Sequence, residues 1–409
     1  MRKLYRNPNF LQALLTIWLI LLFLPGMNLM ELSTENGTIP VSFCYLFSVL
    51  FLPFLFFQLP KMRIPPWYIT GLYVFVLLWA LVQAPGYGLS KNVLQWAFGA
   101  FLLLVLMNLG EYLNQEKRAQ VLEWGVLAFF VCHFIFSLAH WQEIEKVVFQ
   151  GEIASSLSSL SRGGRNLDAT WLGLGCFLIR NKKARFACLI YSFAYAAIGV
   201  SRAGLIASGL CLLWILFLDR RRQWNKKTVL LLCGLGVAGI GAAFALGLAQ
   251  RMIDRVFFGF GEGSNSFLAG RESLWQNVWP MLKSHPLGVG VGNAVKVMRS
   301  EYAFAGYEDV IHNVFFQWTL DEGIVGGLWY LALAGLLFYS QRGRSNGWFR
   351  NEVSAWLLGY GALSLFQFHG GEALMVFVMG CYLLNLNQAV PLTLPRFFSQ
   401  RTQRRVSAE

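Results

Sequence analysis

The amino-acid sequence predicts an all-α membrane protein with about twelve transmembrane helices and a helical loop domain between the ninth and tenth of them. Three observations predict this class: the composition, the length of the apolar runs, and the positions of the cationic residues. Of the 409 residues, 56% are hydrophobic and only 13% are charged, and the mean hydropathy is +0.50. A soluble core does not use so many apolar side chains, so the composition excludes an ordinary soluble domain.

The apolar runs give the expected helices, because a helix needs about 20 apolar residues to span the hydrocarbon core. In chain order, the predicted spans are 10–30, 39–59, 66–84, 91–109, 120–141, 167–179, 185–200, 203–218, 228–248, 318–339, 353–368 and 373–388. The first run follows "MRKLYRN" and has no small-residue cleavage site before "ELSTENGT". We therefore interpret it as an uncleaved first span.

Lysine and arginine residues predict the orientation, because cytoplasmic loops retain positive charge. With Met1 in the cytoplasm, the cytoplasmic segments and the edge residue Arg185 hold 23 of the 34 cationic residues. These segments are 1–9, 60–65, 110–119, 180–184, 219–227, 340–352 and 389–409. Because the number of spans is even, both termini are expected in the cytoplasm.

This topology divides the chain into four parts. Residues 1–248 carry helices one to nine, residues 249–312 form the outer loop domain, residues 313–388 carry the last three helices, and residues 389–409 form a basic tail. The net charge of +13 follows from this orientation and from attraction to anionic membrane lipids, so no nucleic acid partner is expected. All seven cysteines lie in apolar runs, and the outer loops lack metal-binding motifs, so neither metal nor cofactor is expected.

Eleven cationic residues are left on the outer face, where the orientation rule disfavours them. Six of them lie in the loop 249–312, and three more lie in 142–166. A loop of about 60 residues is usually either functional or disordered. The outer face is therefore the expected place for an anionic substrate.

Arg271 begins a predicted helix within this loop. One apolar stripe suits a helix that lies on the membrane surface, and it consists of Leu274, Trp275, Val278, Trp279 and Leu282. Pro286 and Gly288 end the helix. Backbone N–H groups and the helix dipole favour an anion at the helix start, so Arg271 is a candidate phosphate ligand. The alternative is an arginine that pairs with Glu272 or with lipid headgroups.

Arg202 and His312 are the other two candidates. Arg202 stands in "GVSRAG", between two spans joined by almost no loop, where an ionisable group is costly; an arginine that snorkels to the interface is the alternative. His312 ends the long cationic loop and exchanges a proton near neutral pH, although a structural histidine at a helix start has the same position. Asp168 and Glu372, also at outer ends of spans, are lower-ranked candidates, with a helix cap as the alternative for each.

Two classes of function compete for such a protein. A lipid or solute transporter places polar groups near the bilayer midplane on broken helices, often in repeated halves. Here the residues within the spans are overwhelmingly apolar, and polar residues gather at the outer surface. This distribution favours an interfacial enzyme that acts on an anionic amphiphile, with arginines for phosphate and a histidine for hydroxyl chemistry.

Five motifs in order resemble the O-antigen ligase and polymerase family of bacterial envelope assembly. They are "SRAG" (201–204), "GRESLW" (270–275), "HPLGVGVGN" (285–293), "HN" (312–313) and "DEGIVGG" (321–327). The resemblance implies a multi-pass glycosyltransferase of the bacterial inner membrane whose active site faces the periplasm. Its donor would be a glycan linked to undecaprenyl diphosphate.

The resemblance also implies roles for the candidate residues. Arg202, Arg271 and His312 would be catalytic, and the two arginines would bind the donor's diphosphate. Arg165, in the looser match "GGRNLDAT" (163–170), would join them as a diphosphate ligand. His312 and Asn313 would position the acceptor hydroxyl. One outer loop dominates, which favours an O-antigen ligase with lipid A-core as acceptor over the alternative, an O-antigen polymerase, with protein-glycosylating relatives as a third possibility. Because the outer loops lack metal-binding motifs, the transfer is expected to be metal-independent.

Overall fold

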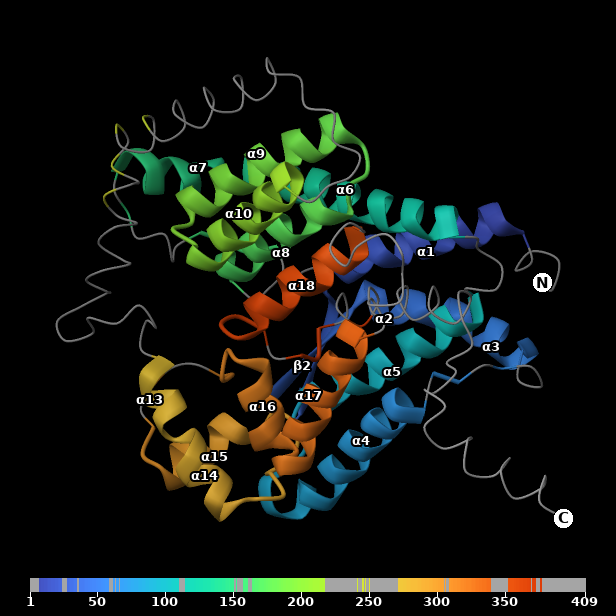
Figure 1. The fold of residues 1–409 in the computed structure, drawn as a ribbon, viewed down its shortest axis with the longest axis vertical. Coiled ribbons are helices and arrows are strands. Elements are labelled where there is room, and N and C mark those ends of the chain that lie inside the picture. Colours follow the sequence, from blue (N-terminus) through green and yellow to red (C-terminus); the bar gives the residue numbers. More distant parts are fainter. Residues whose placement is uncertain are drawn as a thin grey trace, which may run out of the picture.

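The computed structural model describes most of the chain as helices (Figure 1). The described ranges are 7–23, 28–34, 37–58, 67–109, 115–150, 157–160, 164–217, 271–304, 309–339, 352–368 and 370–372, with isolated residues between them. Four predicted parts lie outside the described residues, apart from isolated positions: the span 228–248, the loop 249–270, the span 373–388 and the tail 389–409.

The N-terminal third confirms several predicted spans as helices. They are α1 (Pro8–Phe23), α4 (Trp67–Tyr87), α5 (Asn92–Leu109) and α6 (Gln115–Ala139). The predicted span 39–59 is instead divided into α2 (Phe43–Ser48), the 3-10 turn η1 (Val49–Phe51) and α3 (Leu52–Gln58). Pro53 has no backbone N–H to continue the hydrogen bonds of a preceding turn, which suits a new helix start at Leu52.

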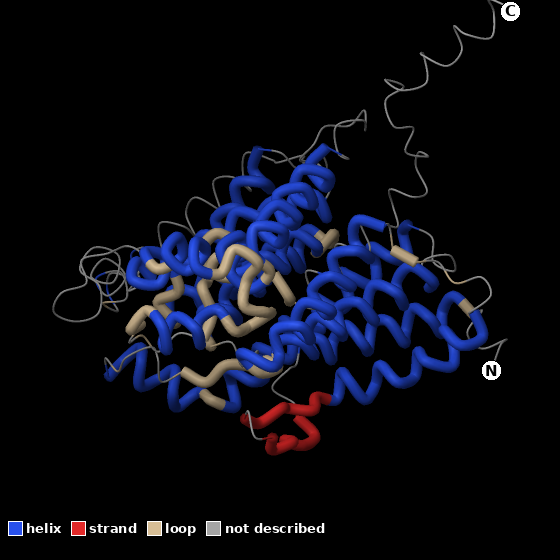
Figure 2. The backbone as a smooth tube through the Cα atoms, turned by 90° about the horizontal axis from the view of Figure 1, so that it is seen from below, coloured by secondary structure: helices blue, strands red, loops and turns tan. Residues whose placement is uncertain are grey.

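A two-stranded β-hairpin follows α1, an exception within the otherwise helical part that the structure describes. Strand β1 (Asn28–Thr34) pairs antiparallel with β2 (Gly37–Ser42), with Thr34 opposite Gly37. The segment is rich in Ser and Thr and contains Asn36-Gly37, a composition that favours strands and a tight turn over a helix. The first helix therefore ends at Phe23, short of residue 30. Figure 2 shows the hairpin at the periphery of the helices.

The remaining elements are short helices and broken spans. They are α7 (Trp141–Glu145), the π-turn η3 (Lys146–Gln150), α8 (Arg165–Leu178), α9 (Lys182–Ile198), α10 (Arg202–Phe217), α13 (Arg271–Gln276), α14 (Val278–Ser284), α15 (Ala294–Glu301), α16 (Val314–Asp321), α17 (Gly323–Tyr339) and α18 (Glu352–Ser364). The predicted span 318–339 is thus two helices that meet at Glu322. The predicted span 353–368 is helical only to Ser364.

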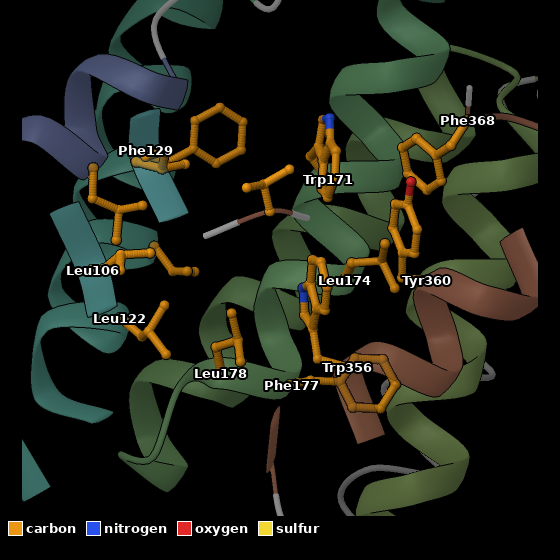
Figure 3. Close-up of a cluster of buried hydrophobic side chains, with 14 of the residues drawn as sticks. Leu106, Leu122, Phe129, Trp171, Leu174, Phe177, Leu178, Trp356, Tyr360 and Phe368 are labelled. Carbon is orange, nitrogen blue, oxygen red and sulfur yellow. The ribbon is translucent and has the colours of Figure 1, made fainter. Parts of the chain in front are cut away.

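Small residues let α8 and α10 approach closely. A Cβ built at Gly204 would lie 2.5 Å from the Cβ of Ala169, and one at Gly173 would lie 2.6 Å from the Cβ of Ala207. Helix α18 packs against both helices and adds a buried aromatic cluster. Figure 3 shows Trp171 of α8 beside Tyr360 and Phe368, with Trp356 below them.

Several helices expose apolar stripes, as membrane-embedded helices do. On α4 the exposed residues Val74, Leu78, Leu81 and Val82 follow helical spacing. The exposed apolar residues of α6 are Val131, Phe134, Ile135 and Leu138, and those of α17 are Ile324, Val325, Leu328 and Leu331. Two helices in the described part, 67–87 and 119–139, are long and apolar enough to cross a membrane, and five shorter apolar helices accompany them. The protein is therefore a helical membrane protein.

Candidate active site

From residue 271 on, the described part of the long loop packs around an apolar cluster shared by α13, α14, α15 and α16. Leu274 and Val278, which belong to the predicted membrane-surface stripe, are fully buried in this cluster, where Ile311 and Leu320 pack with them. The predicted single helix is broken at Asn277 into α13 and α14. The predicted single helix on the membrane surface is therefore wrong, because Leu274 and Val278 pack against other helices of the protein. Trp279, by contrast, is exposed.

The motif "HPLGVGVGN" wraps around the break between α16 and α17. Val289 N donates to Leu320 O (3.1 Å), Gly290 N donates to Asp321 O (2.7 Å), and Ile324 N donates to Pro286 O (3.0 Å). A Cβ at Gly323 would lie 2.5 Å from Pro286 O, and this glycine has φ +69°. The close approach of two backbones explains why the helix stops at Glu322 and why glycine stands there.

Asp321 joins this glycine loop to α16. Its buried carboxylate accepts hydrogen bonds from Gly292 N (2.9 Å) and Ala294 N (3.3 Å), at the start of α15. It also accepts one from the side-chain amide of Gln317 (2.8 Å), one helical turn earlier. The first residue of "DEGIVGG" therefore fastens "HPLGVGVGN" in place.

His312 lies between two anchored neighbours. Asn313 is the N-cap of α16, since its Oδ1 accepts from Phe316 N (3.0 Å). Ile311 N donates to Gln317 Oε1 (2.9 Å), and Ile311 O accepts from Trp275 Nε1 of α13 (3.2 Å). His312 thus stands just before the N-cap of α16, and this helix begins ahead of the predicted span 318–339. Its φ of +58° is unusual for a residue with a side chain.

Arg271 reaches the turn that follows α18. Its Nη1 donates to Phe366 O, and its Nη2 lies 3.5 Å from Gln367 Oε1. Asn313 Nδ2 donates to Leu365 O in the same turn (3.2 Å). Carbonyl groups at a helix C-terminus carry partial negative charge, which favours a guanidinium there. The turn 365–367 thus brings Arg271 and Asn313 together, while the side chain of Glu272 lies outside the described residues.

Arg165 and Arg202 share a second location. Arg202 is the first residue of α10, half-buried, as its place at the edge of the span predicts. Arg165, the first residue of α8, donates from Nε to Gly199 O (2.8 Å), in the short turn that leads to Arg202. Partial burial lowers the pKa of Arg165, and the nearby hydroxyl of Tyr195 acts in the opposite direction. A guanidinium starts from so high a pKa that it stays charged.

The aromatic cluster around α18 links the two locations. The ring centroids of Trp171 in α8 and Phe368 lie 4.7 Å apart, and Phe368 directly follows the turn that Arg271 contacts. In Figure 1, α18 lies between the group of α8 and α10 and the group of α13 to α16. The convergence of Arg202 with Arg271 and His312 on one outer cavity stays a prediction.

The lower-ranked candidates Asp168 and Glu372 each accept a hydrogen bond from a backbone N–H group outside any helix. Asp168 is fully buried in α8, where its Oδ2 accepts from Leu160 N (2.8 Å) and lies 3.6 Å from His133 Nε2. Glu372 accepts from Tyr360 Oη (2.7 Å) and Gly370 N (2.8 Å). Each carboxylate is buried and takes the donors that its surroundings offer, although Asp168 stands in the first turn of α8.

Sequence reasoning missed Gln317 and Gln367. No sequence pattern indicates Gln367, because its contact with Arg271 forms only when the turn after α18 packs against α13. Gln317 had a weak signal, since it stands four residues before Asp321 and helical spacing places both on one face. The five cysteines in the described part carry free thiols within the helices, as the sequence predicts.

Comparisons with known proteins show what this chain is similar to. Residues 187–331 match the model of a family described as O-Antigen ligase. This stretch contains Arg202, Arg271 and His312, whereas Arg165 lies before it. The chain is also similar to the exopolysaccharide production protein ExoQ of Rhizobium meliloti (strain 1021), with 27% identity over 275 residues. That alignment covers 56% of this chain and 60% of the relative, which is less than two thirds of the relative's length.

Proposed function

Because the chain carries an O-antigen ligase domain over residues 187–331, we propose that it is a membrane glycosyltransferase of polysaccharide assembly. In this proposal it moves a glycan from undecaprenyl diphosphate to a sugar hydroxyl of lipid A-core at the periplasmic face. The observation that carries the proposal is the turn 365–367, which Arg271 and Asn313 both contact, with His312 adjacent. A cation for phosphate and a proton acceptor in one neighbourhood are what such a transfer needs.

The proposed chemistry is a single displacement. The acceptor oxygen forms a bond to the anomeric carbon of the donor sugar, and the bond from that carbon to the diphosphate oxygen breaks. The diphosphate leaves with the electron pair, and the acceptor proton passes to His312. Because diphosphate is already a good leaving group, the protein has to neutralise developing charge and align the two substrates.

The three arginines divide this task in the proposal. Arg271 and Arg202 face the diphosphate, since a guanidinium matches phosphate oxygens with paired donors. Arg165 uses Nε to hold the carbonyl of Gly199, so only its terminal N–H groups are left for the diphosphate. Asn313 orients the acceptor beside His312. No metal takes part.

The second candidate is an enzyme that lengthens a lipid-linked glycan. The observation that favours it is the likeness to a protein named for exopolysaccharide production. The two activities share the donor and the leaving group, and they differ in the acceptor. The acceptor is therefore the variable that an experiment has to change.

Purified protein with undecaprenyl-diphosphate-linked glycan, given lipid A-core in one tube only, separates the candidates. Glycan on lipid A-core in that tube alone supports ligation, whereas a longer lipid-linked glycan in both tubes supports the second candidate. No transfer in either tube contradicts the proposed enzyme. Excess chelator in a parallel pair tests metal independence, and activity that is lost there and restored by a divalent ion contradicts it.

A further inference from the structure

The backbone at His312 is held in a disfavoured conformation. A residue with a Cβ rarely adopts a φ of +58°, because the side chain crowds the carbonyl oxygen. Such a conformation persists where the surroundings impose it, and it often stands at a functional site. The contacts around His312 show which groups impose it here.

Gln317 holds the peptide group between Val310 and Ile311, and Trp275 holds the next peptide group, directly before His312, through Ile311 O. The side chain of Gln317 is buried, with 4% of its surface exposed. Its Oε1 accepts from Ile311 N (2.9 Å), and its Nε2 donates to Asp321 Oδ2 (2.8 Å). The two contacts fix which end of the amide is which, because a backbone N–H only donates and a carboxylate accepts.

Asp321 fixes Gln317 in turn. Besides the amide of Gln317, its carboxylate accepts from Gly292 N and Ala294 N, so both of its oxygens are occupied. Buried polar groups of this kind are costly to break, because a lost partner leaves the other group unsatisfied. A chain of hydrogen bonds therefore runs from the glycine loop through Asp321 and Gln317 to the backbone next to His312.

We propose that Gln317 and Asp321 are positioning residues for glycan transfer. They hold His312 in its left-handed conformation and so aim its imidazole at the acceptor hydroxyl. The inference rests on the proposed function, because it needs His312 to handle that hydroxyl. Neither residue touches substrate in this proposal, so a change at Gln317 acts through His312.

A substitution that introduces an ionisable group at Gln317 gives a readout that is specific for this hydrogen-bond network. In Gln317→Glu, a protonated carboxyl reproduces the amide, with C=O accepting from Ile311 N and O–H donating to Asp321. Two carboxylates in hydrogen-bond contact share one proton, and the pair repels once that proton leaves as the pH rises. The variant therefore works at acid pH and fails at alkaline pH.

Other ionisable groups near this pair have to be considered. Glu322 follows Asp321 and is buried, and His312 and Arg271 belong to the proposed site. The charged residues on the packed helices α14 and α15 are exposed, namely Lys283, Lys296, Arg299 and Glu301. All of these are present in the wild-type protein too. The ratio of variant to wild-type activity at each pH therefore isolates the new carboxyl.

The experiment measures transfer from undecaprenyl-diphosphate-linked glycan to lipid A-core by four proteins: wild type, Gln317→Leu, His312→Ala and the double variant. We expect Gln317→Leu to lower kcat about a hundredfold, the scale of a misplaced catalytic group, with KM for the donor near the wild-type value. In the His312→Ala background, Gln317→Leu should cause no further loss. An equal loss in both backgrounds overturns the inference.

Gln317→Glu is the second arm. Its activity relative to wild type should fall at least about tenfold between pH 5.5 and pH 8.5 and recover when the pH is lowered again. The exposed Gln142→Glu is the matched control, and its ratio should stay flat. If Gln317→Leu does not fold, the pH ratio of Gln317→Glu decides, and a flat ratio overturns the inference. If the wild-type protein transfers no glycan, that result contradicts the proposed function itself, and the inference with it.

Discussion

Two regions that hold candidate catalytic residues are built in opposite ways. The first is the turn between α9 and α10 with the start of α10, which carries Arg202, and the second is the loop domain from α13 to the start of α16, which carries Arg271 and His312. Around Arg202, close contacts of small residues in α8 and α10 fix the backbone, as Gly204 against Ala169 shows. Around His312, hydrogen bonds fix it: Trp275 donates to Ile311 O, Gln317 accepts from Ile311 N, and Asn313 donates to Leu365 O. Packing tolerates no added volume, whereas hydrogen bonds can be removed at nearly constant volume. Substitutions should therefore affect folding in the first region and geometry in the second.

The largest effect is expected where the second region meets substrate. Arg271→Ala and His312→Ala should each lower transfer about 10²- to 10³-fold, as the loss of one group that stabilises developing charge does. The unfolding temperature in detergent should change little, and transfer rates per folded molecule provide the measurement. Arg299→Ala and His285→Ala, in the same loop domain, are the matched controls. Near-normal transfer by both test variants would remove the assignment.

In the first region, added volume should lower stability. Gly204→Ala should lower the free energy of unfolding by about 1–3 kcal/mol, because the new Cβ has no room beside Ala169. Thermal unfolding in detergent measures the change. Transfer per folded molecule should stay close to wild type at low temperature. Gly209→Ala, where a Cβ meets nothing within 4 Å, is the control and should unfold like wild type.

Arg165 tests whether the first region also depends on one polar contact. Arg165→Ala removes the hydrogen bond to Gly199 O, a charged bond that contributes about 1.5 kcal/mol. We expect transfer to fall about tenfold, because the terminal N–H groups proposed for the diphosphate are lost with the anchor, and one decade corresponds to about 1.4 kcal/mol of the barrier. A loss as large as that of Arg271→Ala would indicate that Arg165 binds the diphosphate as strongly as Arg271, and unchanged transfer would contradict its proposed place there.

The smallest effect is expected at an exposed ion pair of the second region. Arg299 Nη1 lies 3.3 Å from Asp309 Oδ1, and the Asp309 side chain is 80% exposed. Asp309→Ala should change the free energy of unfolding by less than about 1 kcal/mol, because water and salt screen such pairs. Transfer should be unchanged at both low and high salt. A large loss would mean that polar contacts at the rim also position His312.

The sequence predicted the helices that carry long apolar runs, such as α4 and α5, because hydropathy reports them directly. It also placed Arg202, Arg271 and His312 at helix starts. The β-hairpin was missed although Asn36-Gly37 is a turn signal, because the residues on either side were assigned to the predicted spans 10–30 and 39–59. The break at Glu322 was hidden because it follows from the approach of Pro286, far away in the chain.

The network around His312 was beyond sequence reasoning because its members come from four separate segments. "HN", "HPLGVGVGN" and "DEGIVGG" were recognisable as motifs, yet only their contacts explain the glycines and Asp321 as supports. Asp168 was a lower-ranked candidate with a helix cap as its alternative, and its burial beside His133 could not be inferred from either residue alone. The spacing of residues along one helix can be read from the sequence, whereas contacts between helices can be identified only once the fold is known.

In the proposed function, both regions bind the same lipid diphosphate. Photo-cross-linking with an undecaprenyl diphosphate analogue that carries a diazirine beside the diphosphate tests whether they do. Mass spectrometry should find adducts on peptides from both 199–204 and 311–313, and Arg202→Ala and Arg271→Ala should each reduce both adducts. Adducts confined to one region, or unchanged by either substitution, would contradict a shared site.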